Sequence, residues 1–158
     1  PDSNVIYVLF GSESIININL DFIARKEGFK IIGEGQVGRA ACEAGDVNGD
    51  GITDIVVGAP YSNSYYGISY LIYGKTGFYD DIDLRLLVSD QGFAIFGGEN
   101  NFASGYYVAG NVDVNKDGIA DIVLSAPTIS GEITNPSSQI IFGQRQAVRA
   151  DIYLDKRS

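Results

Sequence analysis

The sequence predicts an all-β fold made of repeated units of four short strands, and three observations lead to this prediction. Runs of β-branched and aromatic residues, bounded by glycine and other turn residues, recur along the chain. No stretch longer than about eight residues has helical periodicity, apart from a helical turn expected near 22–27. Finally, the sequence DVNGDGITDIVVGAP at 46–60 returns as DVNKDGIADIVLSAP at 113–127, an offset of 67 residues (113 − 46).

Four strands are expected in each repeat. The first leads into the repeated acidic motif, the second leaves it, the third ends in an aromatic residue and glycine, and the fourth carries the pattern GFxI. The first strands are expected at 39–45 and 106–112, and the second strands at 54–59 and 121–126. The third strands are expected at 5–11, 68–74 and 138–143, and the fourth strands at 28–33 and 92–97. Four antiparallel strands per repeat fit the blade of a β-propeller better than the coil of a β-helix.

This repeat frame predicts that the propeller is incomplete in one chain. The sequence starts at a third strand and stops after another third strand and the short acidic segment that follows it. We expect a partial blade at 1–37, a full blade at 38–104 and most of a blade at 105–158. Because propellers close with about four to eight blades, we expect either a segment of a longer propeller or a protomer that completes a ring by oligomerisation.

The repeated acidic motif predicts two calcium sites. Oxygen-bearing side chains occupy its first, third, fifth and ninth positions, a backbone carbonyl is available at the seventh, and glycine at the sixth allows a tight turn. Alternating oxygens of this kind suit a hard cation, and three carboxylates in so small a space repel one another without one. The predicted ligands are Asp46, Asn48, Asp50, Ile52 and Asp54 in the first loop and Asp113, Asn115, Asp117, Ile119 and Asp121 in the second.

The motif is not an EF-hand, because the twelfth position holds Val57 or Leu124 where an EF-hand requires a bidentate Glu, and strands flank the loop. It resembles instead the FG-GAP repeat, the blade unit of the integrin α-subunit β-propeller and of many bacterial surface and secreted proteins. The resemblance is carried by AGDVNGDGITDIVVGAP at 44–60 and GNVDVNKDGIADIVLSAP at 110–127. Val37-Gly38 and Ser104-Gly105 stand where that family has Phe-Gly.

The resemblance implies a propeller blade with Ca²⁺ bound between its first and second strands, on one rim of the ring. It also implies an extracellular or cell-surface location. The partners expected on this basis are calcium, further blades supplied in cis or in trans (the latter as a homo-oligomer), and a protein or glycan ligand.

Composition excludes several other functions. The formal net charge of −9 argues against nucleic-acid binding, which requires a basic surface. No run of about 18 apolar residues is present, so we expect no membrane span. The sequence contains no His and therefore lacks the commonest general base. Carboxylate-pair hydrolysis remains open in principle, but calcium binding accounts for the clustered Asp residues, so we expect no enzyme.

Two function classes follow. The first is a calcium-stabilised, non-catalytic interaction or adhesion module, and the second is a purely structural unit that self-assembles into a ring. Tyr61, Tyr65 and Tyr66, in the loop after the first Ala-Pro, favour the first class if they are exposed, because tyrosine gives contact area at small entropic cost. Packing against the neighbouring blade is the alternative role for these tyrosines. The incomplete strand order favours the second class.

Overall fold

The computed structural model describes residues 4–13, 17–77, 79–98, 103–127, 136–146 and 150–154. Within these residues the chain forms eleven strands, in three sheets, and one short 3₁₀ helix at Leu84–Leu86, with no α-helix. The predicted all-β fold is therefore confirmed. The nine longer strands lie where the sequence predicts them, and their ends differ from the predicted ends by no more than two residues. Within the part of the chain that is described, no helix is long and apolar enough to cross a membrane.

The central sheet contains five strands, and the four longer ones lie side by side in the order in which they occur in the chain. Its strands are β3 (Ala40–Gly45), β4 (Asp54–Ala59), β5 (Ile68–Ile72), β7 (Gly92–Phe96) and β11 (Ile152–Tyr153). Their order is β11-β7-β5-β4-β3, and β3, β4, β5 and β7 pair antiparallel with their neighbours. The short β11 joins the β7 edge in the parallel direction. The four longer strands of this sheet thus form one meander, to which a later segment adds a fifth strand.

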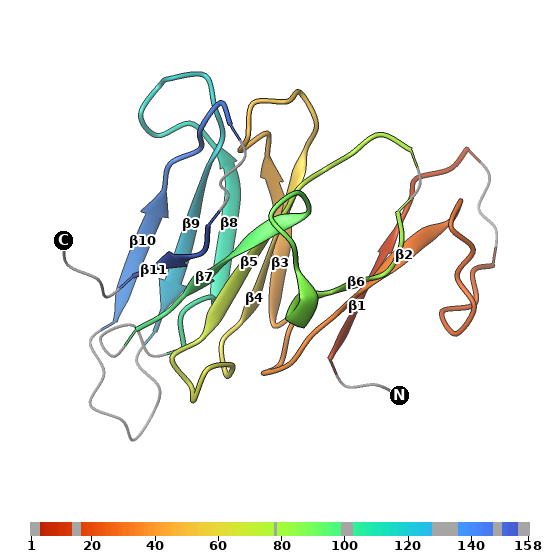
Figure 1. Cartoon of the computed structure of the whole chain (residues 1–158), viewed down its shortest axis with the longest axis horizontal. Helices are drawn as coiled ribbons and strands as arrows, with labels where there is room; N and C mark the ends of the chain where they lie inside the picture. The colour runs from red at the N-terminus through yellow and green to blue at the C-terminus, as the bar shows by residue number, and fades with distance from the viewer. Residues whose placement is uncertain are drawn as a thin grey trace.

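A three-stranded sheet lies on each side of the central sheet (Figure 1). The first sheet contains β1 (Val5–Leu9), β2 (Gly28–Ile32) and β6 (Ile82–Asp83), in the order β1-β2-β6. The third sheet contains β8 (Tyr107–Val112), β9 (Asp121–Ala126) and β10 (Ser137–Ile141), in the order β10-β9-β8.

The central sheet is buried on both faces. Successive residues of a strand point to opposite faces, so Val56 contributes to one apolar cluster and Val57 to another. The cluster between the central and third sheets consists of Ala44, Val47, Val56, Leu71, Tyr73, Phe93, Ile95, Ile122 and Leu124. The cluster between the first and central sheets consists of Phe29, Ile31, Val37, Val57, Ala59, Ile72, Ile82 and Leu84. Burial on both faces explains why residues 55–59 read as the continuous run IVVGA and do not alternate with polar residues.

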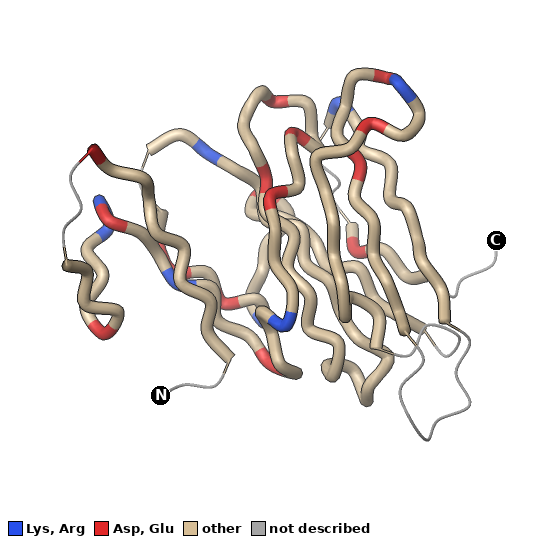
Figure 2. Tube along the Cα trace, turned by 180° about the vertical axis from the view of Figure 1, so that it is seen from behind, with Lys and Arg blue, Asp and Glu red and all other residues tan. Residues whose placement is uncertain are grey.

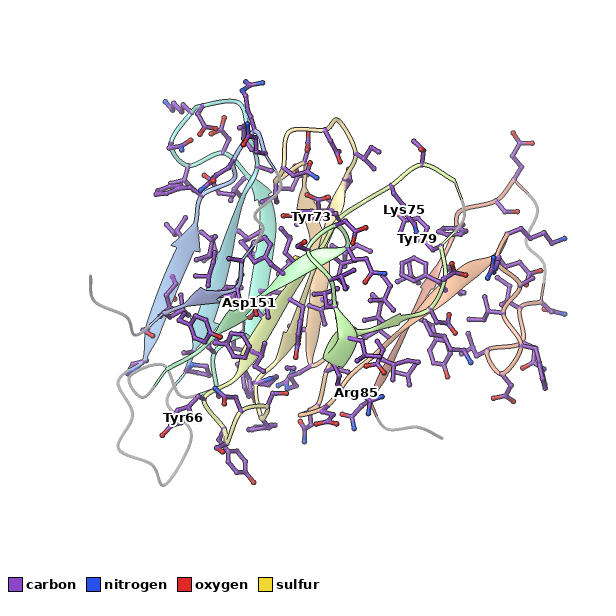
Figure 3. All side chains as sticks on the ribbon, in the orientation of Figure 1. Tyr66, Tyr73, Lys75, Tyr79, Arg85 and Asp151 are labelled. Carbon is purple, nitrogen blue, oxygen red and sulfur yellow. The ribbon has the colours of Figure 1, made fainter. Side chains whose placement is uncertain are left out.

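Short crossover segments join each repeat to the one before it. After β5 the chain returns to the first sheet, where β6 pairs parallel with β2, and after β10 it returns to the central sheet, where β11 pairs parallel with β7. A carboxylate fixes each crossover: Asp81 Oδ1 accepts a hydrogen bond from the Lys30 amide at 2.8 Å. Asp151 Oδ1 accepts one from the Ala94 amide at 2.9 Å, and Figure 3 shows Asp151 beside β7. The sequence pattern predicts four strands per unit and does not reveal this fifth strand.

Candidate metal loops

The two candidate metal loops, residues 46–54 and 113–121, lie at the same end of the molecule. The first connects β3 to β4 and the second connects β8 to β9. Figure 2 shows acidic residues gathered on both loops. The backbone amide of Ala120 donates to the carbonyl of Asp46 at 3.1 Å, so the second loop is hydrogen-bonded to the start of the first. This contact between the loops was not predicted from the sequence.

In the first loop, acidic and amide side chains bond to backbone amides within the turn. Asp46 accepts hydrogen bonds from the amides of Asp50 at 3.0 Å and Gly51 at 2.8 Å. Asp50 accepts one from the Ile52 amide at 2.8 Å. Asn48 accepts one from the Asp50 amide through Oδ1 at 3.0 Å and donates through Nδ2 to Asp50 Oδ2 at 2.9 Å. These bonds hold the loop in one compact turn.

The second loop repeats the same bonds. Asp113 accepts from the amides of Asp117 at 3.1 Å and Gly118 at 2.9 Å, and Asp117 accepts from the amide of Ile119 at 2.9 Å. Asn115 again accepts from the Asp117 amide, at 3.1 Å, and donates to Asp117 Oδ2, at 2.8 Å. Glycine at the sixth position has φ +87° in one loop and +83° in the other, in the left-handed region that favours glycine. Two sequences with different neighbours therefore fold into the same hydrogen-bonded loop.

The ninth position of each loop holds a fully buried aspartate. Asp54 and Asp121 are each 0% exposed. Asp54 accepts from the amides of Val47 at 2.9 Å and Gly74 at 2.8 Å. Asp121 accepts from the amides of Val114 at 2.8 Å and Gly143 at 2.9 Å. Each carboxylate therefore ties the start of its own loop to the end of the third strand of the same repeat.

This tie explains the aromatic-glycine ending of the third strands. A Cβ atom added to Gly74 would overlap the backbone of Thr53, and one added to Gly143 would overlap the backbone of Ala120. Only glycine allows the strand end to approach the loop closely enough for its amide to reach the buried carboxylate. The sequence shows these glycines, but their connection to the metal loops is visible only in the structure.

Burial makes the ionised form of Asp54 unfavourable. Removal from water is the main cause, and the nearby charges of Asp50 and Asp46 act in the same direction, whereas the hydrogen bonds from Gly74 and Val47 act against it. The net effect raises the pKa of Asp54 to about 6. The ionised form of Asp54 is thus disfavoured mainly by its removal from water, and a cation bound in the loop would favour that form.

The structure places the ten predicted ligands in these two loops without gathering three carboxylates around one point. Among the described residues, no group of three or more Asp, Glu, His or Cys side chains is arranged to hold a metal ion. The donors of each loop, carboxylate and amide oxygens with a backbone carbonyl at Ile52 or Ile119, are chemically suited to Ca²⁺. Two lone pairs on each carboxylate oxygen leave sites for an ion beside the hydrogen bonds described above. The two calcium sites accordingly stay predictions.

The tyrosine loop lies at the opposite end of the molecule, where Figure 3 labels Tyr66. Tyr65 is 56% exposed and its ring meets that of Tyr61 edge-on, with 5.8 Å between centroids. The backbone carbonyls of Tyr65 and Tyr66 accept hydrogen bonds from the amides of Ala103 at 2.8 Å and Ser104 at 3.1 Å. The loop backbone is thus hydrogen-bonded to the next repeat, while the Tyr65 ring stays accessible. The contacts are compatible with both predicted roles of these tyrosines, a binding surface and packing against the neighbouring blade. The parallel loop at 128–136 lies, except for Pro136, outside the described residues.

Comparison with known proteins identifies part of this site. Residues 43–72, which run from the end of β3 through the first metal loop to the end of β5, match the FG-GAP repeat family. This segment of the chain is therefore similar to an FG-GAP repeat. The family resemblance recognised in the sequence is confirmed, and the motif that carries it is the loop described above.

Several animal proteins are similar to this chain. Integrin alpha pat-2 of Caenorhabditis briggsae is 36% identical over 94 residues, covering 58% of the chain and 7% of that protein. Phosphatidylinositol-glycan-specific phospholipase D of Rattus norvegicus is 38% identical over 108 residues, covering 64% and 12%. Integrin alpha-6 of Gallus gallus is 34% identical over 89 residues, covering 56% and 8%. The chain therefore spans 7–12% of the length of these relatives.

Proposed function

We propose that this chain is a calcium-binding segment of an FG-GAP β-propeller and serves as a non-catalytic interaction or adhesion module. The central sheet supports the propeller interpretation, because β3, β4, β5 and β7 form a four-stranded antiparallel meander in chain order, as a propeller blade does. The flanking sheets pack on its two faces as neighbouring blades would.

The repetition of the metal loop is the observation that carries the calcium proposal. Among the described residues, the hydrogen bonds that the side chains of residues 46, 48, 50 and 54 make have counterparts at 113, 115, 117 and 121, including both bonds that the buried ninth-position carboxylate accepts. Ordinary polar turns do not require the same oxygen-bearing residues at four positions in two places. The unfavourable ionisation of Asp54 adds a physical reason for a divalent cation at the first loop.

Calcium is proposed to stabilise the structure rather than to act as a signal. Both loops are already closed by hydrogen bonds and by the amides of Gly74 and Gly143, so the ion would reinforce an existing turn. A site filled at about 100 times its dissociation constant adds about 2.7 kcal/mol to the stability of the folded state.

The similarity to integrin alpha chains supports an adhesion-type role and an extracellular or cell-surface location. One group of relatives is named as a phospholipase D, so similarity alone does not decide between binding and catalysis. The chain contains no His, and its clustered aspartates are engaged within the metal loops, which supports a non-catalytic role.

Calcium-dependent melting tests the proposal. The melting temperature of the 158-residue chain is expected to rise on adding Ca²⁺ after treatment with EDTA, and a double variant, Asp46→Ala with Asp113→Ala, is expected to lose that rise. Asp90→Ala, which changes an exposed carboxylate remote in sequence from both loops, serves as the control and should keep it. An identical melting temperature in EDTA and in Ca²⁺ would show that the proposed stabilising role is wrong.

A second candidate function, the self-assembling structural unit, has its own support. The first and third sheets expose apolar side chains on the faces that point away from the central sheet, among them Leu9 at 46% exposure and Ile140 at 45%. Exposed apolar patches of this kind mark interaction sites in soluble proteins.

A further inference from the structure

The second metal loop contacts the first through the peptide group that joins Ile119 to Ala120. The carbonyl of this group, that of Ile119, is the predicted backbone ligand of the second loop. Its amide, that of Ala120, donates a hydrogen bond of 3.1 Å to the carbonyl of Asp46, at the start of the first loop. Because a peptide group is planar, any rotation of the Ile119 carbonyl also redirects the Ala120 amide. One rigid group therefore belongs both to a predicted metal site and to the contact between the loops.

A second connection runs through residues 143–145, which follow β10 and are called the loop strap below. The amide of Gly143 donates to Asp121 Oδ1 of the second loop at 2.9 Å. The next amide, that of Gln144, donates to the carbonyl of Val47 in the first loop at 2.8 Å. Successive residues of the loop strap thus bind the two loops in turn.

Close packing holds the loop strap between the two loops. A Cβ atom added to Gly49 of the first loop would lie 3.2 Å from the Cα atom of Arg145, and one added to Gly118 of the second loop would lie 3.9 Å from Arg145 Nη2. A Cβ atom added to Gly143 would come within 2.9 Å of the carbonyl oxygen of Val47. The loop strap therefore has little room to move without displacing one of the loops.

Both connections end on the first two residues of the first loop, which also close that loop. The Asp46 carboxylate accepts from the amides of Asp50 and Gly51. The Val47 amide donates to the buried carboxylate of Asp54 at 2.9 Å. Bonds from the second loop and from the loop strap therefore fix the backbone that positions the predicted ligands of the first loop.

These contacts give the coupling between the loops a positive sign. A cation at the Ile119 carbonyl would polarise the peptide group and make the Ala120 amide a stronger donor to Asp46, because hydrogen-bonded groups polarise one another. A cation in the first loop would fix residues 46–47, whose carbonyls accept from Ala120 and Gln144. In either order, the second ion binds a loop that is already ordered and therefore loses less conformational entropy.

Repulsion between two ions opposes this coupling. Asp46 and Asp113 line the same cavity, of about 280 Å³, between the loops. Each loop contains three carboxylates, however, so a loop with a bound Ca²⁺ keeps a charge of −1 (−3 + 2). The guanidinium of Arg145, beside the second loop, brings that loop to neutrality at most. An occupied loop thus presents no net positive charge to the second ion.

We propose that the two metal loops bind Ca²⁺ cooperatively, so that an ion in one loop raises the affinity of the other, and that the amides of Ala120 and Gln144 carry this coupling. The proposal rests on the proposed function, since it requires both loops to bind calcium. Coupling between two binding sites is reciprocal, so it has the same size whichever loop is filled first. Neighbouring repeats would then take up calcium together.

Isothermal titration calorimetry of the 158-residue chain at pH 7.5 tests the coupling. Asp46→Ala leaves only the second loop able to bind Ca²⁺ and keeps the backbone carbonyl that accepts from Ala120, and Asp113→Ala leaves only the first loop. The product of the two dissociation constants of the wild type is expected to be at least about fivefold smaller than the product of the two single-loop constants.

Gln144→Pro tests the loop strap, because proline has no amide hydrogen to donate to Val47. This variant should lose at least about half of the coupling factor, since the Ala120 bond remains. Lys75→Pro is the matched control. Lys75 follows Gly74 as Gln144 follows Gly143, but its amide donates to the Tyr79 hydroxyl at 2.7 Å and not to a metal loop. It should keep the full coupling, and circular dichroism confirms that each variant is folded.

Hydrogen exchange gives a second measurement that needs no proline variant. In Asp113→Ala, where only the first loop binds, Ca²⁺ should slow the exchange of the Ala120 and Gln144 amides, although both lie outside that loop. Exchange of these two amides that Ca²⁺ leaves unchanged would overturn the proposal.

The calorimetric outcomes separate this proposal from the one on which it rests. A wild-type product equal to the single-loop product means that the loops bind independently, which overturns the coupling while the calcium proposal stands. A larger wild-type product means that repulsion dominates, and it overturns the coupling as well. Undiminished coupling in Gln144→Pro overturns the role of the loop strap. A wild-type chain that binds no Ca²⁺ overturns both proposals.

Discussion

Asp54 and Gly74 are joined by a hydrogen bond of 2.8 Å between a fully buried carboxylate and the backbone amide at the end of a strand. Asp121 and Gly143 repeat this bond at 2.9 Å. The two residues of each pair belong to different parts of the repeat, the ninth position of the metal loop and the end of the third strand. The bond therefore holds the end of the third strand against the metal loop, although the two residues are about twenty positions apart in the sequence.

Replacing the strand-end glycine tests this coupling. Gly74→Ala is expected to lower the free energy of unfolding by about 2 kcal/mol or more, because the new Cβ overlaps the Thr53 backbone and moves the amide away from Asp54. Gly11→Ala is the matched control, since a Cβ there meets nothing within 4 Å. Urea denaturation of both variants measures the difference, and equal stabilities would show that the close approach at Gly74 is unimportant.

The raised pKa of Asp54, about 6, predicts an unusual pH dependence for the metal-free protein. The folded state binds this proton more tightly than the unfolded chain, whose aspartates titrate near 3.9. Protonation of Asp54 therefore adds stability as the pH falls through about 6, and ionisation removes that stability as the pH rises. In EDTA, the stability of the wild type relative to Asp54→Asn is expected to increase by about 1–2 kcal/mol between pH 7.5 and pH 5.

Urea denaturation at a series of pH values in EDTA provides this comparison. The Asn variant serves as the reference because it cannot titrate at residue 54, while the other carboxylates remain and contribute equally to both proteins. A stability difference that does not change with pH would show that Asp54 ionises normally. If Ca²⁺ binds the first loop, it is expected to remove the pH dependence, since the ion replaces the proton.

The crossover carboxylate of Asp151 is expected to stabilise the edge of the central sheet. Asp151→Ala removes the acceptor for the Ala94 amide and should lower the free energy of unfolding by about 1–2 kcal/mol. The Ala94 amide should also exchange with deuterium faster, because it loses its partner. Asp90→Ala, an exposed carboxylate in the turn before β7, should change stability by less than about 0.5 kcal/mol. Unaltered exchange at Ala94 would contradict the role assigned to Asp151.

Lys116 has a strained backbone that glycine should relieve. Its φ is +62°, at the position where the first loop has Gly49 with φ +74°. The left-handed conformation costs about 1–2 kcal/mol for a residue with a Cβ. Glycine avoids this cost but loses more backbone entropy on folding, which offsets a part of the gain. Lys116→Gly should therefore be more stable than Lys116→Ala by up to about 1 kcal/mol in EDTA. The Ala variant is the control because it lacks the charge but keeps the Cβ, and thermal melting compares the two.

The sequence predicts the longer strands and both metal loops because their signals are local. A strand such as β4 is recognised from its own β-branched residues, and the first metal loop from the spacing of Asp46, Asn48, Asp50 and Asp54. The crossover strands are different, since β6 and β11 contain only two residues each and show no periodicity. Their positions depend on hydrogen bonds that Asp81 and Asp151 accept from backbone amides of strands more than fifty residues away in the sequence.

The arrangement of the side chains within the metal loops also could not be predicted from the sequence. The pattern indicates which oxygens could bind an ion, but it does not show that Asp54 is fully buried beneath the loop and bonded to Gly74. Nor does it show that Ala120 joins the two loops through the carbonyl of Asp46. These contacts depend on how two sheets pack against each other, and local spacing carries no information about that packing.

The crossover of β11 onto β7 has a consequence for how the protein can be divided. The outermost strand of the central sheet is supplied by residues 152–153, although the meander that it completes ends at residue 96. A truncation after residue 104 would leave a whole repeat by sequence but would expose the β7 edge and the Ala94 amide. A unit cut at that point lacks the edge strand and the carboxylate acceptor that residues 151–153 of the next repeat supply.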